Sequence, residues 1–487
     1  MKILTKITGA NEDELQKVLY SFFSVFFLLI SYYMIKPLRD SEFLKEFPSD
    51  LLPLFFTIIA FVSLFVTKVF NYFYDRYDLY RCVFATFIIM MLAKVFFYFT
   101  LPYESKIIVI IFYFWAAIYF LLCLAITWSS INFIFTPEQS KRVFGFIALG
   151  AISGSFFGSL FTKLISQSQF HQYLLLSSAL FMGGSLACIL QASKGEKLWT
   201  PEENTPAPGI DVFGELIYIM KHKYVRSIAI MVFSLAMCNT ITNFQVKKVI
   251  EHELSLRTIL PILKSQSDLS HVKDLQALTL FLVSLKNEKD EQLFLQKLPK
   301  INKALGISWN QARCEKILKE FKEQFGKNIT DFLSFTYGAI SLVGTILLLF
   351  FSKFIFTKLG VQFAASLLPL LFIFILVSLF FFGSLEFVQI LMILAGAFNY
   401  SLNNATKEIL YTPTSSTVKG KVKPIIEGPI MRIGDVSASI ITMILLAIFD
   451  EKTYLILYPS VGILMSAFWF FTVYNSTKEY EQLSQED

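Results

Sequence analysis

The sequence has few charged residues and few of the side chains that catalytic and metal sites use. Charged residues make up only 16% of the chain, whereas an ordinary soluble domain carries roughly a quarter. There are 4 His and 5 Cys, and the cysteines form no CxxC pair, which argues against a zinc site or a disulfide scaffold. HExxH, Walker A and GxSxG motifs are absent. We therefore predict a protein that is not an enzyme and that needs no cofactor or metal.

Apolar and aromatic side chains are abundant instead. Hydrophobic residues make up 55% of the 487 residues, with 54 Phe among them, and the mean hydropathy is +0.58. These values exclude a disordered, collagen-like or typical soluble protein. A membrane helix needs about 20 mainly apolar residues. We predict an all-α membrane protein with twelve such helices, near residues 15–38, 51–73, 80–101, 106–135, 142–166, 171–192, 225–247, 330–357, 361–384, 387–409, 425–449 and 453–475.

The positions of Lys and Arg predict the orientation of these helices. If the N-terminus lies inside, the short cytoplasmic segments carry most of the basic residues, for example around 194–226 and 407–423, as the positive-inside rule requires. Both termini are then cytoplasmic. The expected surroundings are a lipid bilayer, and no nucleic-acid partner is predicted.

The order of the predicted helices suggests two six-helix repeats. Residues 1–192 form the first bundle, and 193–224, with three prolines, form a cytoplasmic linker. Residues 225–248 form helix 7, 249–329 a small helical extracytoplasmic insert, and 330–487 the remaining helices. Thr136-Pro137 and Thr412-Pro413 end corresponding helices of the two halves, followed in each by basic residues, as expected of a duplicated transporter. The alternative is that apolar helices capped by basic residues look alike everywhere.

Polar residues inside apolar helices are costly and usually face a cavity or another helix. Two trios share the spacing i, i+4, i+8, which places each along one stripe of an α-helix. They are Asn239, Asn243 and Lys247 in helix 7, and Asn399, Asn403 and Lys407 in helix 10. Two such stripes facing one cavity would hold a polar anion. The alternative is interhelical contacts made by Asn, with Lys snorkelling to a membrane surface.

Charged residues occur in three other predicted helices. In helix 11, Arg432 and Asp435 are three residues apart and can pair, with Glu427 one turn earlier. This arrangement would bind an anion through Arg432 held by Asp435, or would be a self-neutralising structural pair. Lys94 lies within helix 3 without an acidic residue at i±3 or i±4, so it would meet either a substrate or an interhelical partner.

The end of helix 1 and helix 5 carry two further patterns. Lys36, Arg39 and Asp40 end helix 1, where Arg suits bidentate phosphate recognition and an interfacial anchor is the alternative. Helix 5 contains the spacing GxxxGxxxG at Gly150, Gly154 and Gly158. This pattern predicts close packing against another helix.

Several of these segments resemble the bacterial and plastid nucleotide transporters, the ATP:ADP antiporter family. The resemblance covers residues 31–41 with Lys36-Pro37-Leu38-Arg39-Asp40, residues 136–145, residues 243–247, and residues 408–435. It implies the fold of the major facilitator superfamily and exchange of nucleotides, most simply ATP for ADP, across a bacterial inner membrane.

We therefore predict a transporter that works by alternating access around a midplane cavity. A nucleotide with about three or four negative charges needs several cations to hold it. The predicted substrate-binding residues are Lys36, Arg39, Lys94, Arg142, Asn239, Asn243, Lys247, Asn399, Asn403, Lys407 and Arg432. The predicted gating or pairing residues are Asp40, Glu427 and Asp435.

Two alternatives remain open at this level. One is a proton-coupled carrier of another anionic or small metabolite, with an acidic residue such as Asp40, Glu427 or Asp435 as its proton site. The other is a transporter-derived receptor whose 249–329 insert binds a protein partner.

Overall fold

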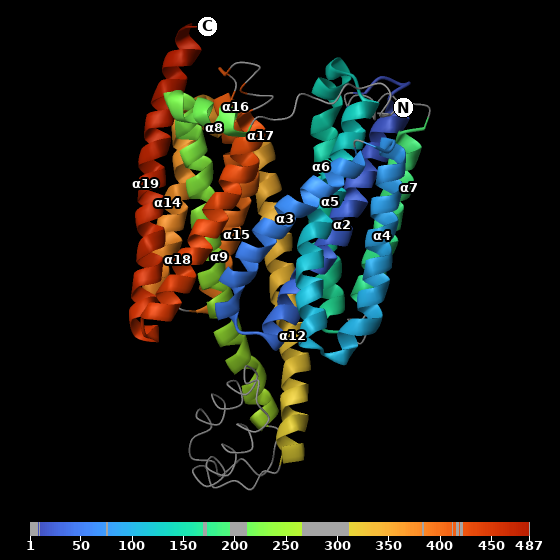
Figure 1. Cartoon of the computed structure of the whole chain (residues 1–487), viewed down its shortest axis with the longest axis vertical. Coiled ribbons are helices and arrows are strands. Elements are labelled where there is room, and N and C mark those ends of the chain that lie inside the picture. Colours follow the sequence, from blue (N-terminus) through green and yellow to red (C-terminus); the bar gives the residue numbers. More distant parts are fainter. Residues whose placement is uncertain are drawn as a thin grey trace. The chain divides into compact units, whose positions relative to one another are not determined.

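The computed structural model describes residues 8, 10–74, 76–168, 173–194, 212–264, 311–381, 384–411, 413–414, 418 and 422–486. Within these ranges the chain is almost entirely helical (Figure 1). Eleven helices in the described ranges are long and apolar enough to cross a membrane, so the predicted all-α membrane fold is confirmed. The remaining predicted run, 51–73, forms α3 (Leu52–Tyr74). The apolar helical stretch at this position, Ser49–Ser63, is shorter than the other eleven. The number twelve stays a prediction.

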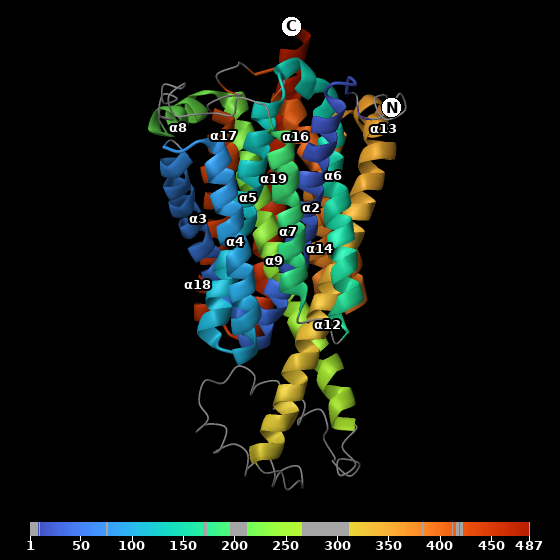
Figure 2. The same ribbon diagram turned by 90° about the vertical axis from the view of Figure 1, so that its right-hand side faces the viewer.

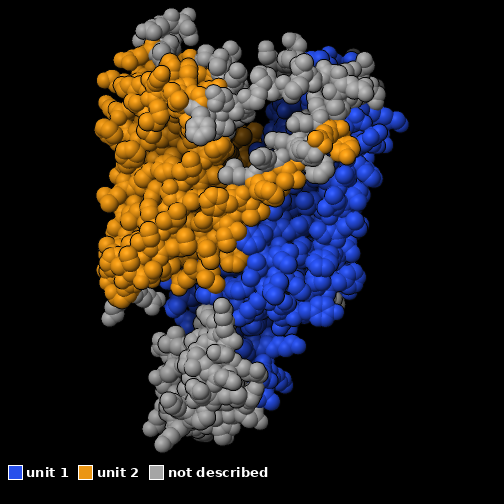
Figure 3. All heavy atoms as spheres, in the orientation of Figure 1, with its two compact units in different colours: residues 1–49, 78–198, 248–338 blue, residues 50–77, 199–247, 339–487 orange. Residues whose placement is uncertain are grey.

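The helices form two compact units (Figure 3). Unit 1 contains Met1–Ser49, Asp78–Leu198 and Lys248–Gly338, and unit 2 contains Asp50–Tyr77, Trp199–Lys247 and Ala339–Asp487. Both α9 (Lys223–Lys264) and α12 (Gln311–Ile346) contribute one part to each unit. The predicted repeat of six helices in each half stays a prediction.

Unit 1 is organised around α2 (Leu15–Glu46). This helix packs against α5 (Lys106–Ile134), α6 (Pro137–Ser166) and α7 (Leu174–Ala192), while α4 (Leu79–Thr100) packs on α5 and α7. The contact between α6 and α2 depends on the predicted glycine stripe. A Cβ at Gly154 would lie 2.3 Å from the carbonyl oxygen of Phe26, and a Cβ at Gly150 or Gly158 would lie 2.6 Å from another carbonyl oxygen of α2. The prediction that this stripe packs against a helix is confirmed.

The start of α6 is fixed by its own sequence. The Thr136 hydroxyl accepts from the Gln139 backbone N–H at 3.4 Å, and the Gln139 side chain accepts from the Thr136 N–H at 2.9 Å. This reciprocal capping box satisfies two backbone donors that a helix start otherwise leaves unpaired. Pro137, which has no N–H, occupies the first turn. The polar cap therefore fixes where the membrane helix begins.

Unit 1 also contains one end each of α9 and α12. Both ends extend beyond η2 (Leu101–Tyr103), the turn between α4 and α5 (Figure 2). Of the predicted helical insert 249–329, residues 249–264 belong to α9 and residues 311–329 to α12, so both described parts are helical and continue these helices. The rest of the insert lies outside the described residues. That residues 249–329 form a separate extracytoplasmic domain stays a prediction.

Unit 2 combines long helices with several π-helical turns. Among the long helices, α14 packs along α19, and α3 packs on α18. Within the predicted linker, Val212–Lys221 form the helix α8. A π-turn shifts the direction of the side chains that follow it. The helices introduced here are α8 (Val212–Lys221), α13 (Ser352–Phe354), α14 (Gly360–Phe381), α15 (Leu385–Phe398), α16 (Asn404–Tyr411), α17 (Lys423–Ile425), α18 (Met431–Ile448) and α19 (Glu451–Glu486), and the π-turns are η5 (Leu347–Phe351), η6 (Ile355–Leu359), η7 (Asn399–Asn403) and η9 (Ile426–Ile430).

Large apolar side chains remain exposed on both units. Phe99 and Leu180 in unit 1, and Phe350 and Leu464 in unit 2, each have more than half of their surface accessible. A soluble protein rarely leaves so many large apolar groups in water. These surfaces suit the acyl chains of a bilayer, in agreement with the predicted membrane helices.

Candidate functional site

The charged residues at the end of α2 form a cluster in unit 1. The Arg39 guanidinium donates to Asp40 Oδ1 at 2.7 and 3.0 Å, and the Asp40 carboxylate is almost fully buried. The Tyr337 hydroxyl, from α12, donates to Asp40 Oδ2 at 3.4 Å. The structure thus pairs the predicted gating residue Asp40 with the predicted binding residue Arg39.

Tyrosine rings complete this cluster. The Lys36 Nζ lies 3.9 Å from the centre of the Tyr337 ring and 5.3 Å from that of Tyr33. The Arg39 guanidinium carbon lies 4.9 Å from the centre of the Tyr113 ring. Aromatic faces stabilise a cation without neutralising it. Because no carboxylate lies within ion-pair distance of Lys36 among the described residues, its charge remains available to an anion.

Lys94 occupies a different environment in unit 1. It is fully buried. Its Nζ donates to the Ser31 hydroxyl of α2 and, at 2.9 Å, to the Ser178 hydroxyl of α7, and it lies 4.2 Å from the centre of the Tyr119 ring. These contacts connect α4 to three neighbouring helices. They match the interhelical alternative for Lys94, and a substrate role for it stays a prediction.

Arg142 forms an ion pair at the N-terminal ends of α2 and α6. Its Nη2 lies 3.0 and 3.1 Å from the two carboxylate oxygens of Glu14. Burial acts to raise the pKa of Glu14, but hydrogen bonds from the Asn11 backbone, Gln139 and Arg142 outweigh it and lower the pKa. Glu14 therefore stays ionised and holds Arg142. Arg142 therefore lies far along α2 from Lys36. This position suits electrostatic attraction of an anion toward the protein better than direct binding beside Lys36.

In unit 2, Arg432 and Asp435 of α18 form the predicted i, i+3 pair. Arg432 Nη1 lies 3.1 Å from Asp435 Oδ2, and the Thr240 hydroxyl of α9 donates to Asp435 Oδ1 at 2.8 Å. The Arg432 side chain is 38% exposed and that of Asp435 is 16% exposed. Arg432 thus has free surface with which to contact a second anion while Asp435 holds it.

This pair gives a prediction that separates binding from simple neutralisation. We expect Arg432→Gln to reduce transport by about tenfold to a hundredfold, the value of one charge-assisted hydrogen bond. The double variant Arg432→Gln/Asp435→Asn should be equally impaired, because neutralising Asp435 does not restore the lost cation. Recovery of transport in the double variant, measured beside each single variant, would instead identify a structural pair.

The other predicted residues of helices 10 and 11 lie around two π-turns. Lys407 Nζ is 3.8 Å from Glu427 Oε1, an ion pair that is too long for a hydrogen bond. Asn399 and Asn403 bound η7, and their side chains hydrogen-bond at 3.1 Å. A π-turn lies between Asn399 and Asn403, yet their side chains still meet, as the predicted stripe requires. That Lys407 shares a cavity with them stays a prediction.

The corresponding residues of helix 7 lie on α9. Lys247 is buried, and its Nζ lies 5.5 Å from the centre of the Phe56 ring of α3. Asn239 and Asn243 are partly buried. Their side chains have no hydrogen-bond partner within the part of unit 2 that the structure describes. They can therefore bond to a polar ligand.

Sequence reasoning missed the aromatic and hydroxyl partners of the charged residues. Tyr33 lies three residues before Lys36, so its contact follows from helical spacing. Tyr113 and Tyr337 come from α5 and α12, and Thr240 comes from α9. No local pattern connects these residues to α2 or α18, so only the fold reveals them.

A family model matches part of the chain. Residues 384–480 match the family model described as TLC ATP/ADP transporter. The chain resembles these nucleotide transporters. The match confirms the predicted resemblance, of which the segment 408–435 lies in the matched range, and it includes α16, which carries Lys407, and α18, which carries Arg432 and Asp435. No curated protein matches the chain significantly.

Solved structures of transporters share the fold of the whole chain. The nucleoside transporter NupG aligns with a TM-score of 0.54 and 10% identity, covering 96% of this chain and 99% of that one. The human organic anion transporter MFSD10 (TETRAN) gives 0.55 and 9%, covering 95% and 100%. The POT family transporter PepTSo gives 0.54 and 12%, covering 97% and 99%. The chain therefore shares the fold of these transporters. The eleven long apolar helices of the described ranges indicate a multi-pass membrane protein, and the matches point to a transporter rather than an enzyme.

Proposed function

We propose that this protein exchanges nucleotides across a membrane, ATP for ADP in the simplest case. The observation that carries the proposal is the cation Lys36, which rests on two tyrosine rings without an ion-paired carboxylate in the described part of the chain. The TLC match supports a nucleotide as the substrate. We also propose a bacterial inner membrane and, from the Lys and Arg distribution, cytoplasmic termini.

The charges within each unit suit a phosphate chain. In unit 1, Lys36 and Arg39 stand beside the single carboxylate Asp40, and in unit 2, Lys407 and Arg432 lie at the carboxylates Glu427 and Asp435. We propose that Lys36 and Arg39 contact phosphate oxygens, with Arg432 and Lys407 as the corresponding cations of unit 2. Tyr33, Tyr113 and Tyr337 supply rings on which a purine can stack, and Asn239 and Asn243 supply amide contacts.

The ion pairs also supply a reason for exchange. Each predicted gating carboxylate lies beside a predicted substrate-binding cation. A bound polyphosphate would take these cations from the carboxylates. We propose that in the empty transporter the cations stay paired with their carboxylates, and that these ion pairs must break before it can reorient. Reorientation without substrate is then slow, so that a nucleotide must enter for each one that leaves.

Uptake into intact cells tests the proposal. Cells expressing the chain should accumulate labelled ATP, and unlabelled ATP or ADP added outside should drive the label out again. Phosphate should not displace it. An uncoupler that abolishes uptake, with no efflux on addition of ADP, would instead favour a proton-coupled carrier. Absence of nucleotide uptake by correctly inserted protein would reject the nucleotide as substrate.

A further inference from the structure

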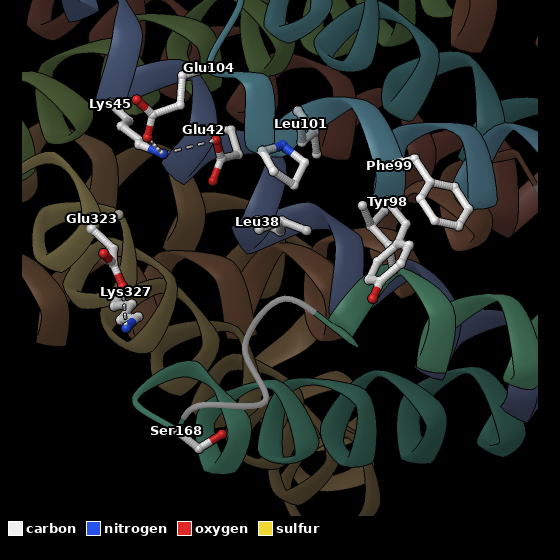
Figure 4. A pocket seen from close by; sticks show the side chains of 13 residues that line it. Leu38, Glu42, Lys45, Tyr98, Phe99, Leu101, Glu104, Ser168, Glu323 and Lys327 are labelled. Carbon is white, nitrogen blue, oxygen red and sulfur yellow. Dashed lines mark hydrogen bonds and ion pairs between the residues drawn. The ribbon is translucent and has the colours of Figure 1, made fainter. Parts of the chain in front are cut away.

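A pocket of about 470 Å³ lies in unit 1, beside the turn between α4 and α5 (Figure 4). One side carries charged residues, which are Glu42 and Lys45 of α2, Glu104 after η2, and Glu323 and Lys327 of α12. The other side is apolar and includes Tyr98, Phe99 and Leu101. The pocket is therefore amphipathic, with room for a ligand that has both a charged and an apolar part.

This pocket is separate from the cation cluster proposed to bind the nucleotide. Successive residues of an α-helix are rotated by about 100°, so Leu38, Glu42 and Lys45 share one face of α2 while Lys36 and Asp40 share the opposite face. The pocket also has the wrong charge for a polyphosphate, since its lining contains more carboxylates than ammonium groups. Its ligand is therefore not the transported anion.

On the charged side of the pocket, the carboxylates of Glu42 and Glu104 share a single counterion. Lys45 Nζ lies 3.3 Å from a Glu104 oxygen and 3.8 Å from a Glu42 oxygen, so two carboxylates share one ammonium group. The Glu42 side chain is only 14% exposed. A largely buried carboxylate without a full counterion favours a cationic ligand group. Lys327, which pairs with Glu323 at 2.9 Å, places a cation at the same pocket that can contact a phosphate.

The apolar side continues onto the lipid-facing surface. Phe96 and Phe99 of α4 and Ile107 of α5 are each more than half exposed. These residues flank the turn that joins two membrane helices, which is the level at which lipid headgroups lie. A ligand in the pocket can therefore extend hydrocarbon along α4 and α5 while its charged part stays between α2 and α12.

We propose that this pocket binds the headgroup of a phospholipid that carries a primary amine, as in phosphatidylethanolamine. The ammonium group donates to Glu42 and Glu104, and the phosphate contacts Lys327. The acyl chains lie on the apolar surface of α4 and α5. A quaternary choline has no N–H to donate to the two carboxylates, so the pocket distinguishes the amine lipid from phosphatidylcholine.

Native mass spectrometry of the detergent-solubilised full chain tests this proposal. The delipidated protein is titrated with phosphatidylethanolamine or phosphatidylcholine of identical acyl chains. We expect the first molecule of phosphatidylethanolamine to bind about tenfold more tightly than the first molecule of phosphatidylcholine, which is the value of a charge-assisted hydrogen bond. Equal affinities, or preference for the choline lipid on the aromatic wall, would overturn the proposal. This comparison needs no variant and does not depend on transport.

Variants then locate the site. Glu42→Gln and Glu104→Gln should remove the preference for the amine lipid, whereas Lys327→Gln should weaken both lipids because both contain phosphate. Glu408→Gln is the matched control, since Glu408 pairs with Lys423 in unit 2 and does not line the pocket. Retention of the preference in both pocket variants would place the lipid elsewhere and overturn the assignment.

A competition experiment distinguishes a phospholipid from a free soluble headgroup as the ligand of the pocket. Phosphoethanolamine, the isolated headgroup, should displace the bound lipid only at concentrations far above those of the lipid itself, because it lacks the acyl contacts. Displacement at equal concentrations would show that the apolar wall contributes nothing and would overturn the lipid as the ligand.

Discussion

Replacing Lys36 with Gln should reduce nucleotide transport by about tenfold to a hundredfold, the value of one charge-assisted contact to phosphate. The reason is that Lys36 is held by the rings of Tyr33 and Tyr337 and not by a carboxylate in the described chain. Its removal leaves no acidic partner exposed, so folding should be little affected while binding is lost. Initial rates of labelled ATP uptake, normalised to the amount of protein in the membrane, measure the effect.

Two further variants test whether the effect depends on the positive charge of residue 36 and on its position in the chain. Lys36→Arg keeps the cation and should retain more transport than Lys36→Gln. Lys358→Gln removes an exposed lysine of η6, and it should transport normally. If Lys36→Gln transports as well as Lys358→Gln, the cluster at the end of α2 does not bind the substrate.

The second large effect concerns the packing of α6 on α2. Gly154→Ala should destabilise the protein by about 1–3 kcal/mol, because an added methyl group forces backbone or side-chain shifts in a tightly packed contact. Its Cβ would lie 2.3 Å from the Phe26 carbonyl oxygen, which is backbone and cannot rotate away. The measurement is the apparent melting temperature in detergent, together with the yield of monodisperse protein.

The same helix supplies a matched control. A Cβ at Gly145 meets no atom within 4 Å, so Gly145→Ala should be neutral or stabilising by about 0.5–1 kcal/mol through reduced backbone freedom of the unfolded chain. Equal melting temperatures for the two variants would contradict the close approach of α6 to α2. Because α2 also carries Lys36 and Arg39, the Gly154 variant should lose transport as well as stability.

The sequence predicts those features that depend on local spacing. Long apolar runs predict the membrane helices, and the interval of four between Gly150, Gly154 and Gly158 predicts their contact with another helix. The interval of three between Arg432 and Asp435 predicts their ion pair. In each case the geometry of a regular α-helix alone brings the residues together.

Features that depend on tertiary contacts or irregular helices could not be predicted. Tyr337 contacts Lys36 across about three hundred residues of sequence, because α12 packs beside α2 in unit 1. The π-turn at Asn399–Asn403 has no sequence signal as strong as that of proline or glycine. For Lys94 the sequence leaves both a substrate and an interhelical partner open, and only the fold shows that Ser31 and Ser178 contact it.

Exchange in reconstituted vesicles tests the central claim most directly. Purified protein is placed in proteoliposomes that are loaded with ADP or left empty, and labelled ATP is added outside. The account predicts that loaded vesicles take up ATP at least about tenfold faster than empty ones, a difference of about 1.4 kcal/mol in the barrier to reorientation. Equal uptake into empty and loaded vesicles would contradict exchange, and no uptake into either would contradict transport of ATP.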